Sequence, residues 1–376
     1  MRYYVIAGEA SGDLHGSNLI RALRRQDPQA EFRSWGGDLM EAAGTVLVKH
    51  YRDLAFMGFV EVIRNLPVIL QNLRLCKEDI QAYQPDALIL IDYPGFNLRI
   101  AKWAHGLGLR IIYYISPQVW AWKESRVKGI KTYVDKMLVI LPFEKEFYRK
   151  WNYEVDYVGH PLVEVVEEAK RQVQAPLSSK PIVALLPGSR KQEVALKLPV
   201  MLAVSKYFPE YQFIVAQAPS LDDTFFAPLL EGYPGVQTIR NNTYGLLTQA
   251  SAALVTSGTA TLETALFGVP EAVCYKGDQI SYEIARRLIK VKYISLVNLI
   301  MDKPVVKELI QGEMNVEALK QELEKILTEA DYRQRILADY AALWNILSQG
   351  GHASDTAAGI IYRYVKDEEK AAPAVR

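Results

Sequence analysis

Short apolar segments alternate with longer segments of helical spacing along most of the chain. In the first half, the apolar segments occupy residues 2–8, 31–37, 87–92, 110–116, 136–141 and 154–159. Several are apolar throughout, which is typical of parallel strands that helices cover on both faces. Helical stretches such as SNLIRALRRQ (17–26) lie between them. This alternation predicts repeated β-α-β units.

The alternation starts again in the second half, with predicted strands at 181–188, 212–218, 236–241, 252–258 and 270–275. After about residue 316, the spacing is helical only. The pattern predicts an α/β protein with two Rossmann-like, doubly wound domains that face a cleft. We expect the domains to span 1–165 and 166–349, with a C-terminal helix at 350–366 packing back on the first.

Composition narrows the class of protein. The chain has 376 residues, which is more than one ordinary core needs, and half of them are hydrophobic. The net charge of +1 gives no global field that would indicate a nucleic-acid partner. The two distant cysteines, Cys76 and Cys274, fit a reducing compartment. We expect neither a signal peptide nor a transmembrane helix, because no apolar run is long enough.

The loops after the strands are the candidate sites, because open α/β sheets bind ligands beyond the carboxyl ends of their strands. The first loop, AGEASGDLHGSN (7–18), combines three glycines with Ser11 and with the titratable residues Glu9, Asp13 and His15. Glycines allow a close approach to a ligand, so this loop predicts a substrate site. A simple turn whose Asp or Ser caps the next helix is the alternative. The dinucleotide pattern G-x-G-x-x-G is absent.

Two further loops of the first half carry candidate chemistry. Asp92, in IDYPGFNLR (91–99), ends a buried strand and is placed either as a general base or as a helix cap. In YISPQVWAWKESRVK (114–128), Trp120 and Trp122 precede Lys123. Indoles beside a cation predict a sugar or acyl-chain site near an anion, whereas core packing is the commoner fate of tryptophan.

Two strands of the second half end in similar loops, LPGSRKQEV (186–194) and TSGTATLE (256–263). Each predicts a turn that aims backbone N–H groups and a helix N-terminus at the strand end, which is an anion site. Arg190 adds a bidentate cation to the first. In the second, a capping box with Glu263 is the alternative. Two such loops in one domain indicate a diphosphate, with Glu263 reaching a ribose.

Metal and nucleotide-triphosphate chemistry find no support in the sequence. There is no Walker sequence and no Asp-x-Asp, and the five histidines are scattered. We therefore expect no metal site and no cofactor. The charge of a leaving diphosphate would then be balanced by Arg190 and by helix N-termini.

Taken together, seven motifs resemble the lipid-A-disaccharide synthase family. They are GEASGD, IDYPGFN, SPQVWAWK, LPFEKEFY, VGHP, LPGSRKQEV and TSGTATLE, and they occur in the family's order over about residues 3–350. The resemblance implies the GT-B fold. It also implies an inverting transfer from UDP-2,3-diacylglucosamine to 2,3-diacylglucosamine 1-phosphate (lipid X), with release of UDP. A UDP-GlcNAc 2-epimerase-like isomerase and a non-catalytic nucleotide-sugar binding protein are the alternatives.

The resemblance also implies roles for individual residues. The first domain would hold the acceptor, with Asp92 as the base, Asp13 or Glu9 as alternatives, and Asn97 positioning a hydroxyl. The second domain would hold UDP through Gly188, Ser189, Arg190, Gln192, Glu193, Ser257, Gly258, Thr259 and Glu263. Many relatives read D-x-P-D-F-N, so the role of their second carboxylate does not transfer to Gly95.

Acylated substrates imply a surface that meets the cytoplasmic face of the inner membrane. The candidate is LAFMGFVEVIRNLPVILQNLRL (54–75), which is rich in apolar residues and includes Arg64 and Arg74. A buried helix pair is the alternative. The expected partners are the two substrates and this membrane surface, with no nucleic acid, and a homodimer is the oligomeric state to test.

Overall fold

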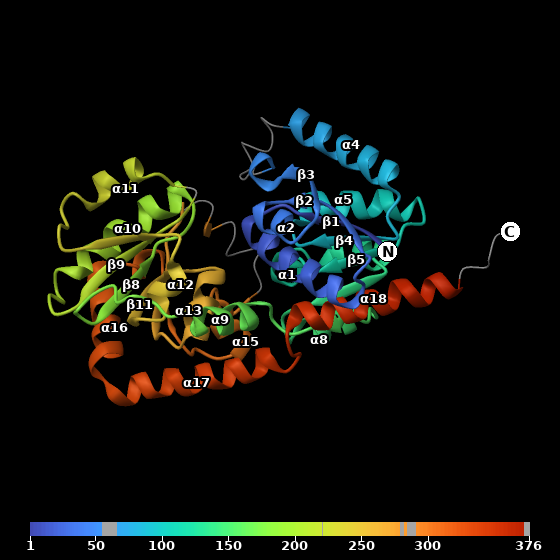
Figure 1. Ribbon diagram of the computed structural model, residues 1–376. Coiled ribbons are helices and arrows are strands. Elements are labelled where there is room, and N and C mark those ends of the chain that lie inside the picture. The colour runs from blue at the N-terminus through green and yellow to red at the C-terminus, as the bar shows by residue number, and fades with distance from the viewer. Residues whose placement is uncertain (55–65, 220, 279–281, 284–290, 372–376) are drawn as a thin grey trace. The chain divides into compact units, whose positions relative to one another are not determined.

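The chain forms two compact units, each built around one parallel sheet (Figure 1). The computed structural model describes residues 1–54, 66–219, 221–278, 282–283 and 291–371. The first unit comprises Met1–Pro161 and Ser348–Arg376, and the second comprises Leu162–Leu347. Both are Rossmann-like α/β domains, which confirms the fold class predicted from the alternating pattern.

The first unit contains a sheet with the strand order β3-β2-β1-β4-β5-β6-β7 in its described residues. All the pairs are parallel. The strands are β1 (Arg2–Ala7), β2 (Glu31–Gly36), β3 (Val46–His50), β4 (Ala87–Ile91), β5 (Ile111–Tyr114), β6 (Lys136–Val139) and β7 (Asp156–Tyr157). The order reverses between β1 and β4, so the loops after these two strands lie next to each other at the carboxyl edge.

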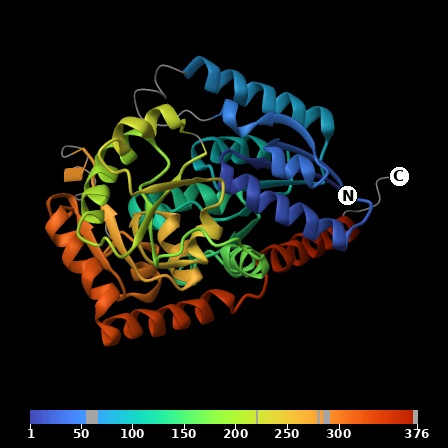
Figure 2. The same ribbon diagram turned by 60° about the vertical axis from the view of Figure 1, so that its left-hand side comes forward.

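Helices cover both faces of this sheet. They are α1 (Ala10–Gln26), α2 (Asp38–Ala42), α4 (Leu66–Tyr83), α5 (Pro94–His105), α6 (Val119–Trp122), α7 (Val127–Tyr133), α8 (Glu144–Arg149) and α18 (Ala353–Ala371). Alternation along β1 sends Tyr3 and Val5 into a core shared with α1 and α18. Tyr4 and Ile6 enter the opposite core, which α4 and α5 cover (Figure 2).

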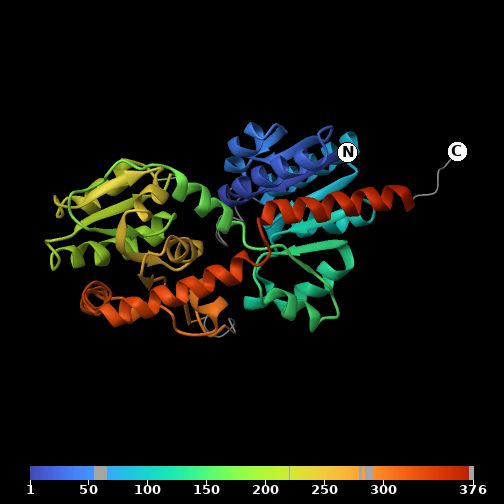
Figure 3. The ribbon, with the colours of Figure 1, turned by 60° about the horizontal axis from the view of Figure 1, so that its bottom comes forward.

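The last helix, α18, returns to the first unit and lies beside α1 (Figure 3). Its residues Ala357 and Ile361 are buried in the core of that unit, and Asp355 pairs with Arg25 at 2.5 Å. The expectation that the C-terminal helices pack on the first domain therefore applies to α18. The preceding helices α16 (Val316–Thr328) and α17 (Ala330–Ser348) instead pack into the core of the second unit.

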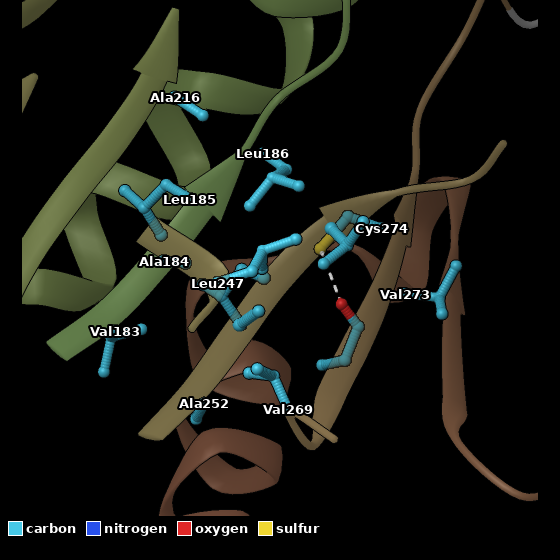
Figure 4. Packing of buried hydrophobic residues seen from close by; sticks show 14 of the residues in the cluster. Val183, Ala184, Leu185, Leu186, Ala216, Leu247, Ala252, Val269, Val273 and Cys274 are labelled. Carbon is cyan, nitrogen blue, oxygen red and sulfur yellow. Dashed lines mark hydrogen bonds between the residues drawn. The ribbon is translucent and has the colours of Figure 1, made fainter. Parts of the chain in front are cut away.

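The second unit contains a sheet of order β10-β9-β8-β11-β12-β13, again parallel in every described pair. Its strands are β8 (Ile182–Leu186), β9 (Gln212–Gln217), β10 (Gln237–Arg240), β11 (Ala250–Thr256), β12 (Glu271–Tyr275) and β13 (Lys307–Ile310). Its other helices are α9 (Leu162–Arg171), α10 (Lys191–Ser205), α11 (Asp223–Leu230), α12 (Thr243–Leu247), α13 (Thr259–Phe267) and α15 (Leu296–Met301). Figure 4 shows the apolar core, in which Leu185 of β8 and Cys274 of β12 are buried.

Candidate functional site

A cavity of about 470 Å³ opens at the carboxyl ends of β8 and β11 in the second unit. Both predicted anion loops line it, together with Gln217 at the end of β9 and Thr243 at the start of α12. The lining residues from the two loops are Leu186, Gly188, Ser189, Arg190, Glu193, Thr256, Ser257, Gly258, Thr259, Ala260 and Glu263, and Gln192 is not among them. The sheet topology therefore brings together two loops that lie almost seventy residues apart in sequence.

The loop after β8 has a backbone that a ligand can approach closely and an exposed cation, Arg190. Gly188 has φ +115°, and a Cβ there would lie 2.7 Å from Glu193 Oε2, so only glycine fits without strain. Helix α10 begins at Lys191, and the N–H groups of its first turn, which includes the exposed Gln192, lack intrahelical acceptors. Arg190 is 63% exposed and lies 3.4 Å from Glu193. The loop can thus present a guanidinium and backbone donors to an anion.

The loop after β11 is built in the same way around Gly258, the N-cap of α13, which has φ +148°. Glycine has no side chain to accept from the N–H groups of the first turn, so the alternative capping box does not form. Glu263 Oε1 instead accepts a hydrogen bond from Tyr244 at 3.1 Å, and burial raises the pKa of Glu263. Ser257 Oγ donates to the carbonyl of Ile294, whereas Thr259 is exposed at the helix start.

In the first unit, Asp92 follows β4 in an unusual backbone conformation. Asp92 has φ 42° and Tyr93 has φ 48°, and two successive non-glycine residues in this region are strained. Asn97 Nδ2 donates to the carbonyl oxygens of Asp92 at 2.8 Å and Ile91 at 3.2 Å. Tyr113 donates its hydroxyl hydrogen to the Asp92 carbonyl at 2.5 Å. These bonds hold the strained loop in place.

The electrostatics around Asp92 suit a base that works near neutral pH. The pKa of Asp92 is raised from 3.8 to about 7, mainly by burial and also by the nearby Glu9, against a backbone hydrogen bond from Tyr93 that lowers it. The side chain does not cap α5, so the alternative reading of Asp92 as a helix cap is wrong. A carboxyl with this pKa can take a proton from a hydroxyl.

The loop after β1 packs tightly beside Asp92. A Cβ on Gly8 would lie 2.3 Å from the ring of Tyr93, so glycine is required there. Glu9 is the N-cap of α1, and Ser11 is exposed on the first turn. Asp13 is 3% exposed and accepts hydrogen bonds from the N–H groups of Gly37, Leu39 and Met40. Asp13 therefore binds the first turn of α2, and the alternative, in which an Asp or Ser of this loop caps α1, does not form.

The tryptophan motif lies after β5. Trp120 is buried, packs edge-on against Phe143 and donates its Nε1 hydrogen to Glu144 at 3.3 Å. Glu144 also accepts from the Leu141 N–H at 2.9 Å, and burial raises its pKa to about 7. Trp120 is thus a packing residue of this loop. Trp122 ends α6, and Lys123 beside it is exposed.

Three residues that contact the candidate site residues were not predicted from the sequence: Tyr113, Tyr244 and Lys197. Tyr113 was not predicted because its sequence context is that of an ordinary residue of strand β5. Tyr244 was not predicted because its hydrogen-bond partner, Glu263, lies in another loop. Lys197 lies three residues after Val194, so helical spacing places it on the apolar face of α10. This spacing could have predicted that Lys197 is buried. Across the described ranges, no group of three His, Cys, Asp or Glu side chains could hold a metal ion.

The two parallel-sheet, Rossmann-like units define the class of fold, the GT-B fold, which solved glycosyltransferases and epimerases share. A glycosyltransferase of kitacinnamycin has a TM-score of 0.66 to this chain at 13% identity, covering 97% of this chain and 99% of its own. A UDP-GlcNAc 2-epimerase from Neisseria meningitidis has a TM-score of 0.63 at 10% identity, covering 98% and 100%. At these identities the likeness shows the fold alone.

Sequence comparison gives the family. The family model described as Lipid-A-disaccharide synthetase matches residues 3–351. A lipid-A-disaccharide synthase from Syntrophus aciditrophicus is 42% identical over 364 residues, covering 94% of this chain and 95% of its own. One from Geobacter metallireducens is 40% identical, covering 96% of each. The chain belongs to the lipid-A-disaccharide synthase family and is a glycosyltransferase, as the seven motifs predicted. The epimerase alternative is not favoured.

Proposed function

We propose that the chain transfers a diacylglucosamine residue from UDP-2,3-diacylglucosamine to the 6-hydroxyl of 2,3-diacylglucosamine 1-phosphate. The observation that carries the proposal is the anion pocket between the first turns of α10 and α13 in a member of this family. The pocket offers a diphosphate the donors that a helix N-terminus presents to phosphate. The product is the β-1,6-linked disaccharide 1-phosphate, and UDP is released.

The reaction is a single displacement at the anomeric carbon. The bond between that carbon and the β-phosphate oxygen of UDP breaks, and its electron pair leaves with UDP. The acceptor 6-oxygen forms the new bond on the opposite face, so the α-linked donor gives a β-linked product. The 6-hydroxyl proton passes to a carboxylate. As in inverting hydrolases, one general base suffices.

Asp92 is the proposed base. Its raised pKa lets it accept a proton near neutrality, and its strained loop holds the carboxylate at the sheet edge. Glu9 is the neighbouring carboxylate and the first alternative. Asp13 already accepts three backbone hydrogen bonds, so we assign it to holding α2 and the loop after β2. Asn97 holds the base by its backbone rather than by positioning a substrate hydroxyl.

The second unit binds UDP in this proposal. Arg190 and the N–H groups of the two helix N-termini balance the diphosphate charge. The side chain of Glu263 accepts a hydrogen bond from a ribose hydroxyl while it keeps its bond to Tyr244. Ser189 and Thr259, which are exposed at the two loops, supply hydroxyl donors. We assign Trp122 and Lys123 to binding of the acceptor. The Lys123 ammonium would pair with the acceptor's 1-phosphate.

The acylated substrates bring the chain to the membrane surface in this proposal. Of the candidate segment 54–75, residues 55–65 lie outside the described residues. Leu54 is buried, whereas residues 66–75 lie in helix α4, which exposes Val68, Leu70 and Leu75. Beside them is the exposed Arg74, which pairs with Glu78 at 2.7 Å. Apolar side chains next to a cation favour an anionic bilayer. Within the described ranges, no helix has the length and apolar character to cross a membrane.

A transfer assay tests the proposed function. Purified protein is incubated with UDP-2,3-diacylglucosamine and lipid X, and disaccharide and UDP are both quantified by mass spectrometry. We expect one disaccharide per UDP, and Asp92→Asn should abolish both while UDP still binds. If UDP-GlcNAc is converted to its 2-epimer and no disaccharide forms, the epimerase alternative replaces the proposal. The same preparation on a sizing column with light scattering tests the predicted homodimer.

A further inference from the structure

The helix that carries the anion loop of the second unit also contains a buried lysine. Lys197 lies on α10, between Val194 and Met201 on the face that packs into the core, and is 3% exposed. Its Nζ donates a hydrogen bond to Thr256 Oγ1. Throughout the described part of the chain, Lys197 has no salt bridge, so its buried charge has only a neutral hydroxyl as a hydrogen-bond partner.

The hydroxyl partner connects Lys197 to the pocket. Thr256 is the last residue of β11 and lines the 470 Å³ cavity together with Glu193, which lies one helical turn before Lys197. The ammonium group therefore lies directly behind the wall of the pocket, one side chain away from its interior. It approaches from the core, whereas Arg190 approaches from solvent.

A buried ammonium without an ionic partner costs free energy to fold, because its charge leaves water. Burial lowers the pKa of Lys197, an effect that Glu193 and Cys274 oppose and Arg190 reinforces. The cost is offset if an anion binds nearby, because the attraction between charges is stronger where water is excluded. A purely structural link between α10 and β11 would need only a neutral side chain.

We propose that Lys197 is a positioning residue that makes this pocket selective for a diphosphate, acting through Thr256 and through its fixed positive charge. The inference rests on the proposed binding of UDP in the second unit. Lys197 does not touch the ligand. It orients the Thr256 hydroxyl so that its oxygen accepts from the ammonium and its hydrogen points to the cavity, and it adds a positive charge that cannot swing away.

The experiment compares a charged and a neutral ligand of the same pocket. Binding of UDP and of uridine is titrated by NMR or calorimetry to the wild-type protein and to Lys197→Met, which keeps the volume of the side chain and removes its charge. We expect at least a tenfold loss of UDP affinity, and less than a twofold change for uridine. Equal losses for both ligands, or none for UDP, would overturn the proposal.

Control variants separate charge from packing. Lys170→Met removes another lysine of this unit, whose Nζ donates to the Leu266 carbonyl away from the pocket, and should change neither affinity. Lys197→Arg keeps the positive charge, so its ratio of UDP to uridine affinity should stay within threefold of the wild-type ratio. If Lys197→Met fails to fold, Thr256→Val decides instead: a loss for UDP alone supports the proposal, and an equal loss contradicts it.

The outcome also separates this inference from the function proposed above. A wild-type protein that binds no UDP would contradict the proposed function and the inference with it. A wild-type protein that binds UDP, beside a Lys197→Met variant with unchanged UDP affinity, would leave the glycosyl transfer standing and remove only the role of Lys197.

Discussion

Asn97 donates its Nδ2 hydrogen to the backbone carbonyl of Asp92 at 2.8 Å and thereby holds Asp92 in a left-handed conformation. Tyr113 donates to the same carbonyl at 2.5 Å. A backbone held in this way is costly without its bonds, because the left-handed region is disfavoured for a side chain with a Cβ. The position of the carboxylate therefore depends on two side chains that do not need to touch substrate.

Removing the Tyr113 hydroxyl should weaken catalysis. We expect Tyr113→Phe to lower kcat about tenfold or more with an unchanged Kd for UDP, because the base is no longer held in place. The matched control is Tyr153→Phe, which removes a hydroxyl that donates to the Val134 carbonyl at 3.0 Å elsewhere in the unit. Both variants should lose about 0.5–1.5 kcal/mol of unfolding free energy. Equal kcat values for the two would refute the positioning role.

The charge on Glu9 should set the pH dependence of turnover. Asp92 must be ionised to accept a proton, so kcat should rise with pH through about 7. Glu9→Gln removes a negative charge that raises the pKa of Asp92, and the rising limb should move to lower pH. Steady-state kinetics between pH 5 and about 9 measure the limb. A limb that stays in place would show that Asp92 is not the titrating group.

Ionisation of Asp92 should lower the free energy of unfolding as the pH rises. Its pKa is raised from 3.8 in the unfolded chain to about 7 in the folded one, so the folded state keeps the proton over that interval. Stability is then lost between about pH 4 and 7 as the pH increases. Asp92→Asn cannot ionise and escapes this loss. The difference in Tm between variant and wild type should grow with pH, by about 3 °C or more at pH 8; a constant difference would contradict it.

Arg190 should matter for binding and turnover but not for folding. Its side chain is 63% exposed, so Arg190→Ala should leave Tm within about 1 °C. We expect kcat/KM to fall about 10²-fold or more, as on loss of one group that stabilises developing charge. Arg171→Ala, which removes another exposed arginine of this unit, is the control. An effect of less than about threefold on kcat/KM would exclude Arg190 from the site.

Turnover should persist in excess EDTA. In the proposal, Arg190, Lys197 and the N-termini of α10 and α13 balance the charge of the leaving UDP, so no divalent ion is required. The assay is the transfer reaction in chelator-treated buffer, with and without added Mg²⁺. A rate that falls in EDTA and returns with Mg²⁺ would contradict this balance of charge.

The hydrophobic pattern predicted the fully buried strands and also two partly exposed edge strands, β7 and β10. Strands that are covered on both faces, such as β4 (ALILI), are apolar throughout and can be recognised from the sequence. The edge strands β3 (VLVKH) and β13 (KELI) were missed, since they are half exposed and carry charged residues. Their pattern resembles that of a loop, and only pairing with β2 and β12 makes them strands.

The candidate site was predictable where a loop follows its own strand. The two anion loops of the second unit line one cavity, as their position after β8 and β11 implied. The contacts of Asp13 were not predictable, because it caps a helix that begins 25 residues later. The left-handed backbone of Asp92 was not predictable either, since a strained aspartate leaves no signal in one sequence. Lys197 was missed because an isolated lysine in a helix usually faces solvent.

The proposed transfer requires the second unit to bind the diphosphate of UDP at the ends of β8 and β11. A crystal structure of the protein with UDP is the decisive test. We expect the phosphates at the N-termini of α10 and α13, within hydrogen-bond distance of Arg190 and of backbone N–H groups beside Gly188 and Gly258. UDP bound elsewhere, with this pocket empty, would contradict it.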